Sequence, residues 1–192
     1  MVAEKLVAPQ HARLPRPMPL FLDLVRRVAA EDPDLAARAL AGVRVYAHAR
    51  REAAATRPVI ARHGRATLFG AGSSGPPVVL VPSLINPSRV LDLREGRSLL
   101  AHLGASGFRA MLLDWGRPKP GEAQQDIAAH VEACLLPLLD AIGEPVHLVG
   151  YCLGGTMTMA AATLRPVRSL SLLATPWRFA GYPEASRTAL SR

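Results

Sequence analysis

The sequence predicts an α/β fold in which a parallel sheet is flanked by helices and preceded by a small helical region. Two patterns predict the sheet: apolar, β-branched runs of strand length recur in the second half of the chain, and helical patterns separate them. Size is the third observation, because 192 residues with 49% hydrophobic content are enough for one domain with a substantial core.

The first 57 residues are expected to lie outside the sheet. Residues 1–19 are interpreted as a flexible tail, because several prolines interrupt any helical pattern there. Residues 20–57 are interpreted as a helical region containing two helices. The second helix should begin at Asp32, a residue type suited to an N-cap, which is followed by Pro33 in the first turn. We expect that helix to reach about residue 54.

The sheet and its helices are assigned to residues 58–192. Strands are predicted over residues 66–69, 77–82, 108–115, 146–149 and 169–174, and helices over 98–105, 125–142 and from 153 to about 165. In the long helix, Pro137 should introduce a kink, because proline lacks the N–H of a helical bond. Its inward face is predicted to consist of Ile127, Val131, Leu135, Leu138 and Ile142.

The carboxyl ends of parallel strands share one rim of a sheet, and active sites of such folds lie there. Four candidate segments follow predicted strands: residues 82–86, residues 114–116, Cys152 and residues 175–177. Their common location is a stronger indication of a site than any one of them alone.

The run Gly150-Tyr151-Cys152-Leu153-Gly154 is the most informative motif in the chain. A strand, a Gly-x-Cys-x-Gly turn and a helix start have the layout of a nucleophile elbow, with sulfur in place of a serine oxygen. The two glycines leave room for neighbouring backbone, and the helix N-terminus favours thiolate over thiol. The alternative is a small, buried, unreactive cysteine. The surrounding strand and helix favour the nucleophile.

Composition narrows the class of protein. The formal net charge is +8, but the arginines are scattered and no nucleic-acid-binding motif accompanies them, so no nucleic-acid partner is expected. No apolar stretch approaches the length of a transmembrane helix and the N-terminus lacks a secretory signal pattern, which favours a cytoplasmic location. Two cysteines are too few for a disulfide scaffold, and no metal site is predicted.

Several segments together resemble the polyhydroxyalkanoate synthases, an α/β-hydrolase family with a cysteine in the lipase-box position. They are Pro82-Ser83-Leu84-Ile85-Asn86 through Val90-Leu91-Asp92-Leu93, Leu113-Asp114-Trp115, the Gly150 to Thr156 motif, and Ser169 to Pro176. The resemblance covers about residues 60–180. It implies that residues 58–192 are the N-terminal portion of an α/β-hydrolase core, with an incomplete parallel sheet.

The resemblance also implies a reaction. The Cys152 thiolate would attack the thioester of a 3-hydroxyacyl coenzyme A, hold the acyl group and pass it to a hydroxyl of another unit. The backbone N–H groups of Leu153 and Ile85 would stabilise the oxyanion. Substrate-channel candidates, for which packing or loop support is the alternative, are Asn86, Trp115 and Trp177. No cofactor is implied beyond the acyl coenzyme A substrate; a homodimer and a polyester granule surface are the implied partners.

One half of the expected site is missing from the sequence. A hydrolase triad runs nucleophile, acid, histidine along the chain, yet all 6 histidines precede Cys152 and Glu184 is the sole acid after it. We therefore expect a fragment of a longer synthase-like protein with little turnover of its own. The alternatives are a cysteine-type esterase or thioesterase on the same scaffold, and a non-catalytic truncated relative.

Overall fold

The chain forms two compact units, one within Met1–Glu52 and a core unit within Ala53–Arg192. A computed structural model describes residues 18–49, 55–118, 121–122, 125–181, 183–184 and 188. The predicted tail therefore lies outside the described residues, apart from its last two positions, which belong to a helix.

The N-terminal unit contains two helices, α1 (Met18–Glu31) and α2 (Pro33–His48). The predicted helix start is confirmed: the Asp32 side chain accepts a hydrogen bond from the Leu35 N–H at 2.8 Å, and Pro33 occupies the first turn. α2 ends at His48, earlier than predicted, and residues 50–54 lie outside the described part. Among residues 20–48, Ala36 is the one buried side chain.

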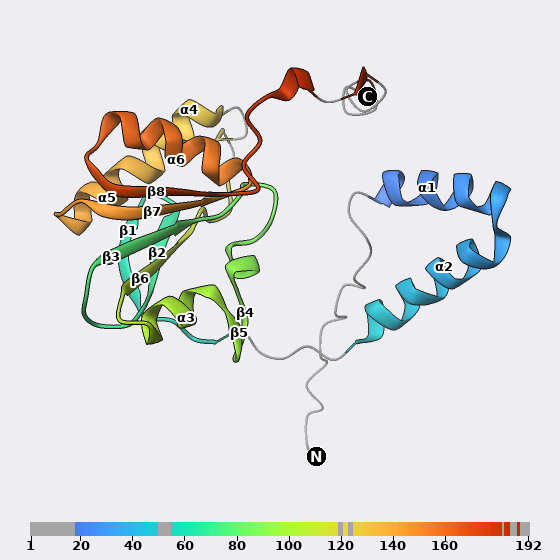
Figure 1. Cartoon of the computed structure of the whole chain (residues 1–192), viewed down its shortest axis with the longest axis horizontal. Helices are drawn as coiled ribbons and strands as arrows, with labels where there is room; N and C mark the ends of the chain where they lie inside the picture. Colours follow the sequence, from blue (N-terminus) through green and yellow to red (C-terminus); the bar gives the residue numbers. More distant parts are fainter. Residues whose placement is uncertain are drawn as a thin grey trace, which may run out of the picture. The chain divides into compact units, whose positions relative to one another are not determined.

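The core unit is built on a six-stranded sheet, shown in Figure 1. Its strands are β1 (Val59–His63), β2 (Ala66–Ala71), β3 (Pro77–Val81), β6 (Arg109–Asp114), β7 (Val146–Tyr151) and β8 (Val167–Leu173). Their spatial order is β1-β2-β6-β3-β7-β8. All five predicted strands are present, and β1 is an addition that no sequence pattern indicated.

The sheet is mainly parallel, as predicted, but not throughout. β6, β3, β7 and β8 run parallel, whereas β2 is antiparallel to both β1 and β6. The connection between β2 and β3 spans residues 72–76, which is too short for the crossover that parallel strands require. The chain therefore reverses direction, and β2 and β3 flank β6 on opposite sides.

Helices cover both faces of the sheet (Figure 1). α3 (Leu99–Ala105) lies on one face, and the other carries α4 (Ile127–His130), the π-helical turn η2 (Val131–Leu135), α5 (Leu136–Ile142) and α6 (Leu153–Leu164). Each face has its own hydrophobic cluster. The larger one, beneath α5 and α6, includes Val79, Leu113 and Leu148; the smaller one includes Leu80, Leu100 and Leu112.

The long helix differs from its prediction in two respects. It contains a wide turn, η2, immediately before Pro137, where a missing N–H is accommodated by π-helical rather than α-helical bonding. Ile127 is exposed, because it is the first residue of the helix and lies beyond the sheet-facing stripe. Val131, Leu135 and Leu138 are buried as predicted.

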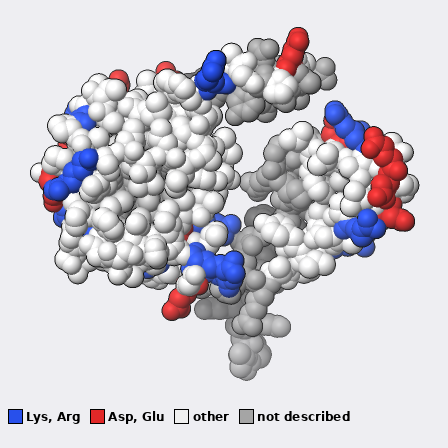
Figure 2. Space-filling model, in the orientation of Figure 1, with Lys and Arg blue, Asp and Glu red and all other residues white. Residues whose placement is uncertain are grey.

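Between β3 and α3 the chain forms η1 (Ser88–Leu91) and a small ribbon of β4 (Asp92–Arg94) and β5 (Arg97–Ser98). On the face shown in Figure 2, the charged side chains of the core unit form small groups with uncharged surface between them. No helix in the described part of the chain is both long and apolar enough to cross a bilayer.

Candidate active site

Cys152 occupies a sharp turn between β7 and α6. Its φ of 54° and ψ of −128° are unusual for a residue with a side chain, and strain of this kind is typical of functional sites. The Cys152 N–H donates to the Leu173 carbonyl at 2.8 Å, which ties the turn to the end of β8. The side chain is half-buried and its thiol is free. The predicted strand–turn–helix layout is thus confirmed.

The two glycines of the motif are required by close packing. A Cβ on Gly154 would lie 2.5 Å from the Pro82 carbonyl oxygen and closer still to that of Val81. A Cβ on Gly150 would lie 2.8 Å from the Gly155 nitrogen on the first turn of α6. Side chains at either position would push α6 away from the sheet, so the missing Cβ atoms are what allow the turn to form.

The two predicted oxyanion donors lie on neighbouring segments. Leu153 is the first residue of α6, and N–H groups at that position have no acceptor within the helix. Ile85 lies in the loop after β3, the strand that pairs with β7. Its N–H donates to the Ser83 hydroxyl oxygen at 3.2 Å, a long bond, while its side chain is 77% exposed.

The predicted channel residues have different environments. Asn86 is exposed on the loop after β3, and Trp177 is 65% exposed on the loop after β8. Trp115 is only 6% exposed, and its indole N–H donates to the Pro82 carbonyl at 3.0 Å. Because a buried ring offers no surface to a substrate, the structure supports the packing alternative for Trp115 and corrects its assignment to a channel.

No histidine or carboxylate among the described residues forms a hydrogen bond with Cys152. His147, on β7, contacts Ser169 through Nδ1 at 2.8 Å, and His130 bonds to the Asp126 carbonyl oxygen. Asp114 accepts from the Ser88 hydroxyl and from the Gly116 N–H. His11 lies outside the described residues. No group of three His, Cys, Asp or Glu side chains in the described part could hold a metal ion.

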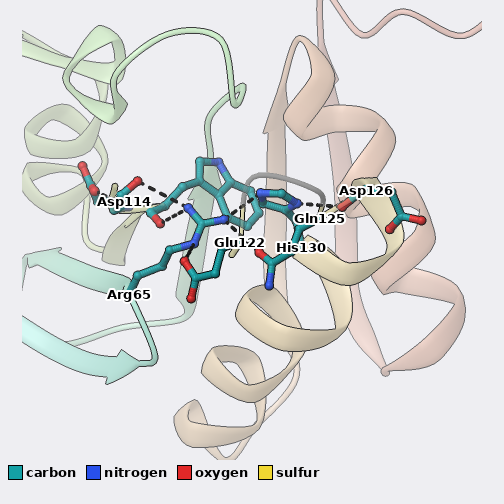
Figure 3. Close-up of polar contacts among 8 residues, drawn as sticks. Arg65, Asp114, Glu122, Gln125, Asp126 and His130 are labelled. Carbon is teal, nitrogen blue, oxygen red and sulfur yellow. Dashed lines mark hydrogen bonds and ion pairs between the residues drawn. The ribbon is translucent and has the colours of Figure 1, made fainter. Parts of the chain in front are cut away.

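Sequence reasoning missed a polar cluster close to this rim, shown in Figure 3. Arg65, whose side chain is nearly buried, extends from the start of β2 toward Glu122 and His130. Its guanidinium donates to the Trp115 carbonyl at 2.9 Å and contacts His130 Nε2 at 2.7 Å. Arg65 is 50 or more positions from each of these partners in the chain, and no local pattern marks long-range polar partners.

The second cysteine has a different environment. Cys134 is buried in η2, and burial raises the pKa of its thiol, which the nearby Arg65 guanidinium offsets in part. A raised pKa means less thiolate at neutral pH, and therefore lower reactivity. Of the two thiols, Cys152 is the one that solvent reaches.

Residues 78–192, more than half of the chain, match the family model described as "Alpha/beta hydrolase family". Two relatives are named poly(3-hydroxyalkanoate) polymerase subunit PhaC. The Haloferax mediterranei protein is 35% identical, over 51% of this chain and 21% of its own. The Synechocystis protein is 34% identical, over 54% of this chain and 29% of its own. The chain thus corresponds to less than a third of these relatives' length.

Solved structures show the same fold at low identity. A laboratory-evolved variant of potato epoxide hydrolase superposes with a TM-score of 0.52 and 21% sequence identity, and the superposition covers 70% of this chain and 45% of the potato enzyme. At this level of identity the similarity shows the fold alone.

Proposed function

The chain belongs to the alpha/beta hydrolase family, and from that premise we propose that it is an acyltransferase-like protein that takes a 3-hydroxyacyl group from coenzyme A onto Cys152. The observation that carries the proposal is the strained turn of Cys152 at the start of α6. The turn requires glycine at positions 150 and 154, because a Cβ at either would clash with neighbouring backbone. Such a turn exposes one nucleophile at the carboxyl end of a strand. The similarity to the PhaC polymerases supports the choice of substrate.

The proposed acylation uses groups that the fold already places. The Cys152 thiol loses its proton to solvent, and the thiolate attacks the thioester carbonyl, whose electrons move to oxygen. Collapse of this intermediate breaks the bond to the coenzyme A sulfur and expels coenzyme A as its thiolate, which takes a proton from solvent. The Leu153 N–H is one donor to the oxyanion. Ile85 is proposed as the second, and its N–H would exchange the long bond to Ser83 for the substrate oxygen. Asn86 and Trp177, exposed near this rim, are proposed to contact the acyl or pantetheine chain.

Transfer to an alcohol is proposed to be slow in this chain. A hydroxyl acceptor needs a general base, and none of the described histidines contacts Cys152. We therefore expect acylation without sustained polymer synthesis. A cytoplasmic location, a homodimer and association with a polyester granule belong to the same proposal; a working free thiol fits a reducing compartment.

Intact-mass measurement of the full chain incubated with 3-hydroxybutyryl coenzyme A tests the proposal. We expect one acyl adduct, mapped to Cys152, that is lost in Cys152→Ala and kept in the matched control Cys134→Ala, whose thiol is buried. An unmodified wild-type protein, or an adduct that survives Cys152→Ala, would contradict it. Coenzyme A released steadily, well beyond one equivalent, would contradict slow transfer.

The second candidate is a cysteine-type thioesterase or esterase on the same scaffold, which the match of residues 78–192 to the alpha/beta hydrolase family allows. The two functions differ in the acceptor, which is water in one and a hydroxyacyl group in the other. Analysis of the products separates them: free 3-hydroxybutyrate indicates hydrolysis, and oligomers indicate transfer. If cells that carry the protein keep their phenotype when Cys152 is replaced by alanine, the chain has a non-catalytic role instead.

A further inference from the structure

The buried indole of Trp115 connects the end of β6 to the loop after β3. Its Nε1–H donates to the Pro82 carbonyl at 3.0 Å, and Pro82 begins that loop. The same carbonyl lies against Gly154, since a Cβ there would be 2.5 Å from it. One buried carbonyl is therefore held between an indole N–H and the first turn of α6, two residues after Cys152.

Arg65 and His130 in turn contact Trp115 and limit its movement. Arg65 donates to the Trp115 carbonyl at 2.9 Å, and the His130 ring packs edge-to-face on the indole, with centroids 6.0 Å apart and an interplanar angle of 78°. Arg65 also donates to His130 Nε2 at 2.7 Å. A guanidinium has only donors, so Nε2 must accept, and the ring hydrogen lies on Nδ1, which donates to the Asp126 carbonyl at 2.6 Å.

Two further residues contact the Arg65 guanidinium. Glu122 lies 3.3 Å from Arg65 Nε, and Gln125 accepts from the same guanidinium at 3.3 Å (Figure 3). Each of these contacts limits the freedom of Arg65, and through it that of Trp115. The indole is therefore fixed at its backbone, at its face and at its N–H.

We propose that Trp115 is a positioning residue for the acylation of Cys152, and that Arg65 and His130 hold it in place. The indole N–H fixes the Pro82 carbonyl and, with it, the loop that carries the Ile85 N–H. An oxyanion donor contributes only when it is held in place beforehand, and a displacement of about 1 Å costs on the order of 100-fold in rate. The inference rests on the proposed acyl transfer and extends it to residues that no substrate touches.

Trp115→Phe tests the proposal, because it keeps an aromatic ring and removes the N–H. Tyr46→Phe is the matched control, because it also removes one donor from an aromatic side chain and lies exposed on α2. Two reactions of Cys152 are compared. Alkylation by iodoacetamide displaces iodide and forms no oxyanion, whereas acylation by 3-hydroxybutyryl coenzyme A forms one. We expect Trp115→Phe to slow acylation at least about tenfold and to change alkylation less than about twofold. Tyr46→Phe should change neither rate by as much as about twofold.

A second variant and a second measurement keep the test independent of folding and of turnover. Arg65→Lys keeps the charge but loses the fork that holds the Trp115 carbonyl, and should give the same pattern more weakly. Hydrogen exchange of the Ile85 amide should be faster in Trp115→Phe and unchanged in Tyr46→Phe.

The possible results distinguish a failure of the positioning role from a failure of the proposed acyl transfer. Acylation and exchange that are both unchanged in Trp115→Phe would overturn the positioning role. An equal fall in alkylation and acylation would overturn it too, because it would indicate general damage to the fold. If the wild-type chain is alkylated but never acylated, the acyltransfer function fails, and exchange at Ile85 still shows whether the indole orders the loop.

Discussion

At the scale of single residues, the site depends on two positions that carry no Cβ atom. Gly154 packs against the Val81 and Pro82 carbonyls at a distance that no Cβ tolerates. The helix carrying Cys152 can begin where it does only because this position has no side chain. The same holds for Gly150 against the backbone of Gly155.

Gly154→Ala is therefore expected to lower the free energy of unfolding by about 1–3 kcal/mol, the usual cost of overpacking a tight interior. The backbone of β3 is the obstacle, so no side chain can rotate away to relieve the clash. Chemical denaturation followed by circular dichroism measures the change. Gly181→Ala is the control, since its Cβ would meet nothing nearer than Arg178 at 3.9 Å. Equal midpoints for the two variants would contradict this account.

The turn at Cys152 could be predicted from the sequence because the residues that define it are close together in the chain. Cys152 and its two glycines lie within five positions of one another, and the pattern carries its own geometry. Trp115 could not be assigned in this way. Its role depends on Pro82, 33 positions earlier, and on Arg65, 50 positions earlier, which only the folded sheet brings together.

At the scale of elements, one ion pair joins the segment before β1 to the β4 ribbon. Arg57 donates to both Asp92 carboxylate oxygens, at 2.9 and 2.8 Å. The hydrogen bonds from Arg57 hold the pKa of Asp92 below its usual value, although burial opposes this shift. The ion pair thus holds the β4 ribbon against the segment before β1.

The lowered pKa predicts a specific pH dependence. Because the folded carboxyl is the stronger acid, the pair stabilises the fold above the pKa of an unfolded aspartate, about 3.9, and this contribution is lost as the pH falls through the lower, folded pKa. Asp92→Asn should thus lower the free energy of unfolding by about 1–3 kcal/mol at pH 7. The gap to wild type should narrow below about pH 4.

Urea denaturation at several pH values measures both effects. Asp140→Asn, which breaks the exposed pair with Arg165, is the matched control and should change stability far less at pH 7. A constant difference between wild type and Asp92→Asn from pH 7 to pH 3 would rule out the linkage.

Elements were predictable where their apolar pattern was strong. The buried run of β3 and the amphipathic helix before Gly143 are examples. β1 was missed because it lies at the edge of the sheet, exposes most of its residues, and has an apolar run of three residues that ends at Arg62 and His63. The antiparallel direction of β2 follows from its short connection to β3. The connection sets this direction only in combination with the strand order, which no local residue pattern gives.

At the scale of the whole molecule, the two ends of the sheet differ. β1 exposes Val59 and Ile60 but ends in Arg62 and His63, whereas β8 ends in Leu172 and Leu173, which are 43% and 41% exposed. Among the described residues β8 pairs with β7 on one side and with no strand on the other. Open edges of this kind present unpaired N–H and C=O groups to any other strand. A second copy of the chain, with its own β8, offers the complementary edge.

The chain is therefore expected to self-associate through β8, two copies pairing antiparallel across a twofold axis, as closed dimers require. Light scattering coupled to size exclusion, over a range of concentrations, measures the mass. Leu172→Lys should shift the equilibrium toward monomer, because a charge on an edge strand cannot be buried in a continuous sheet. Leu164→Lys, at the end of α6 and 52% exposed, tests whether any added charge has that effect. A wild-type chain that stays monomeric at every concentration, or equal responses to the two lysines, would exclude the β8 interface and leave the proposed homodimer to another surface.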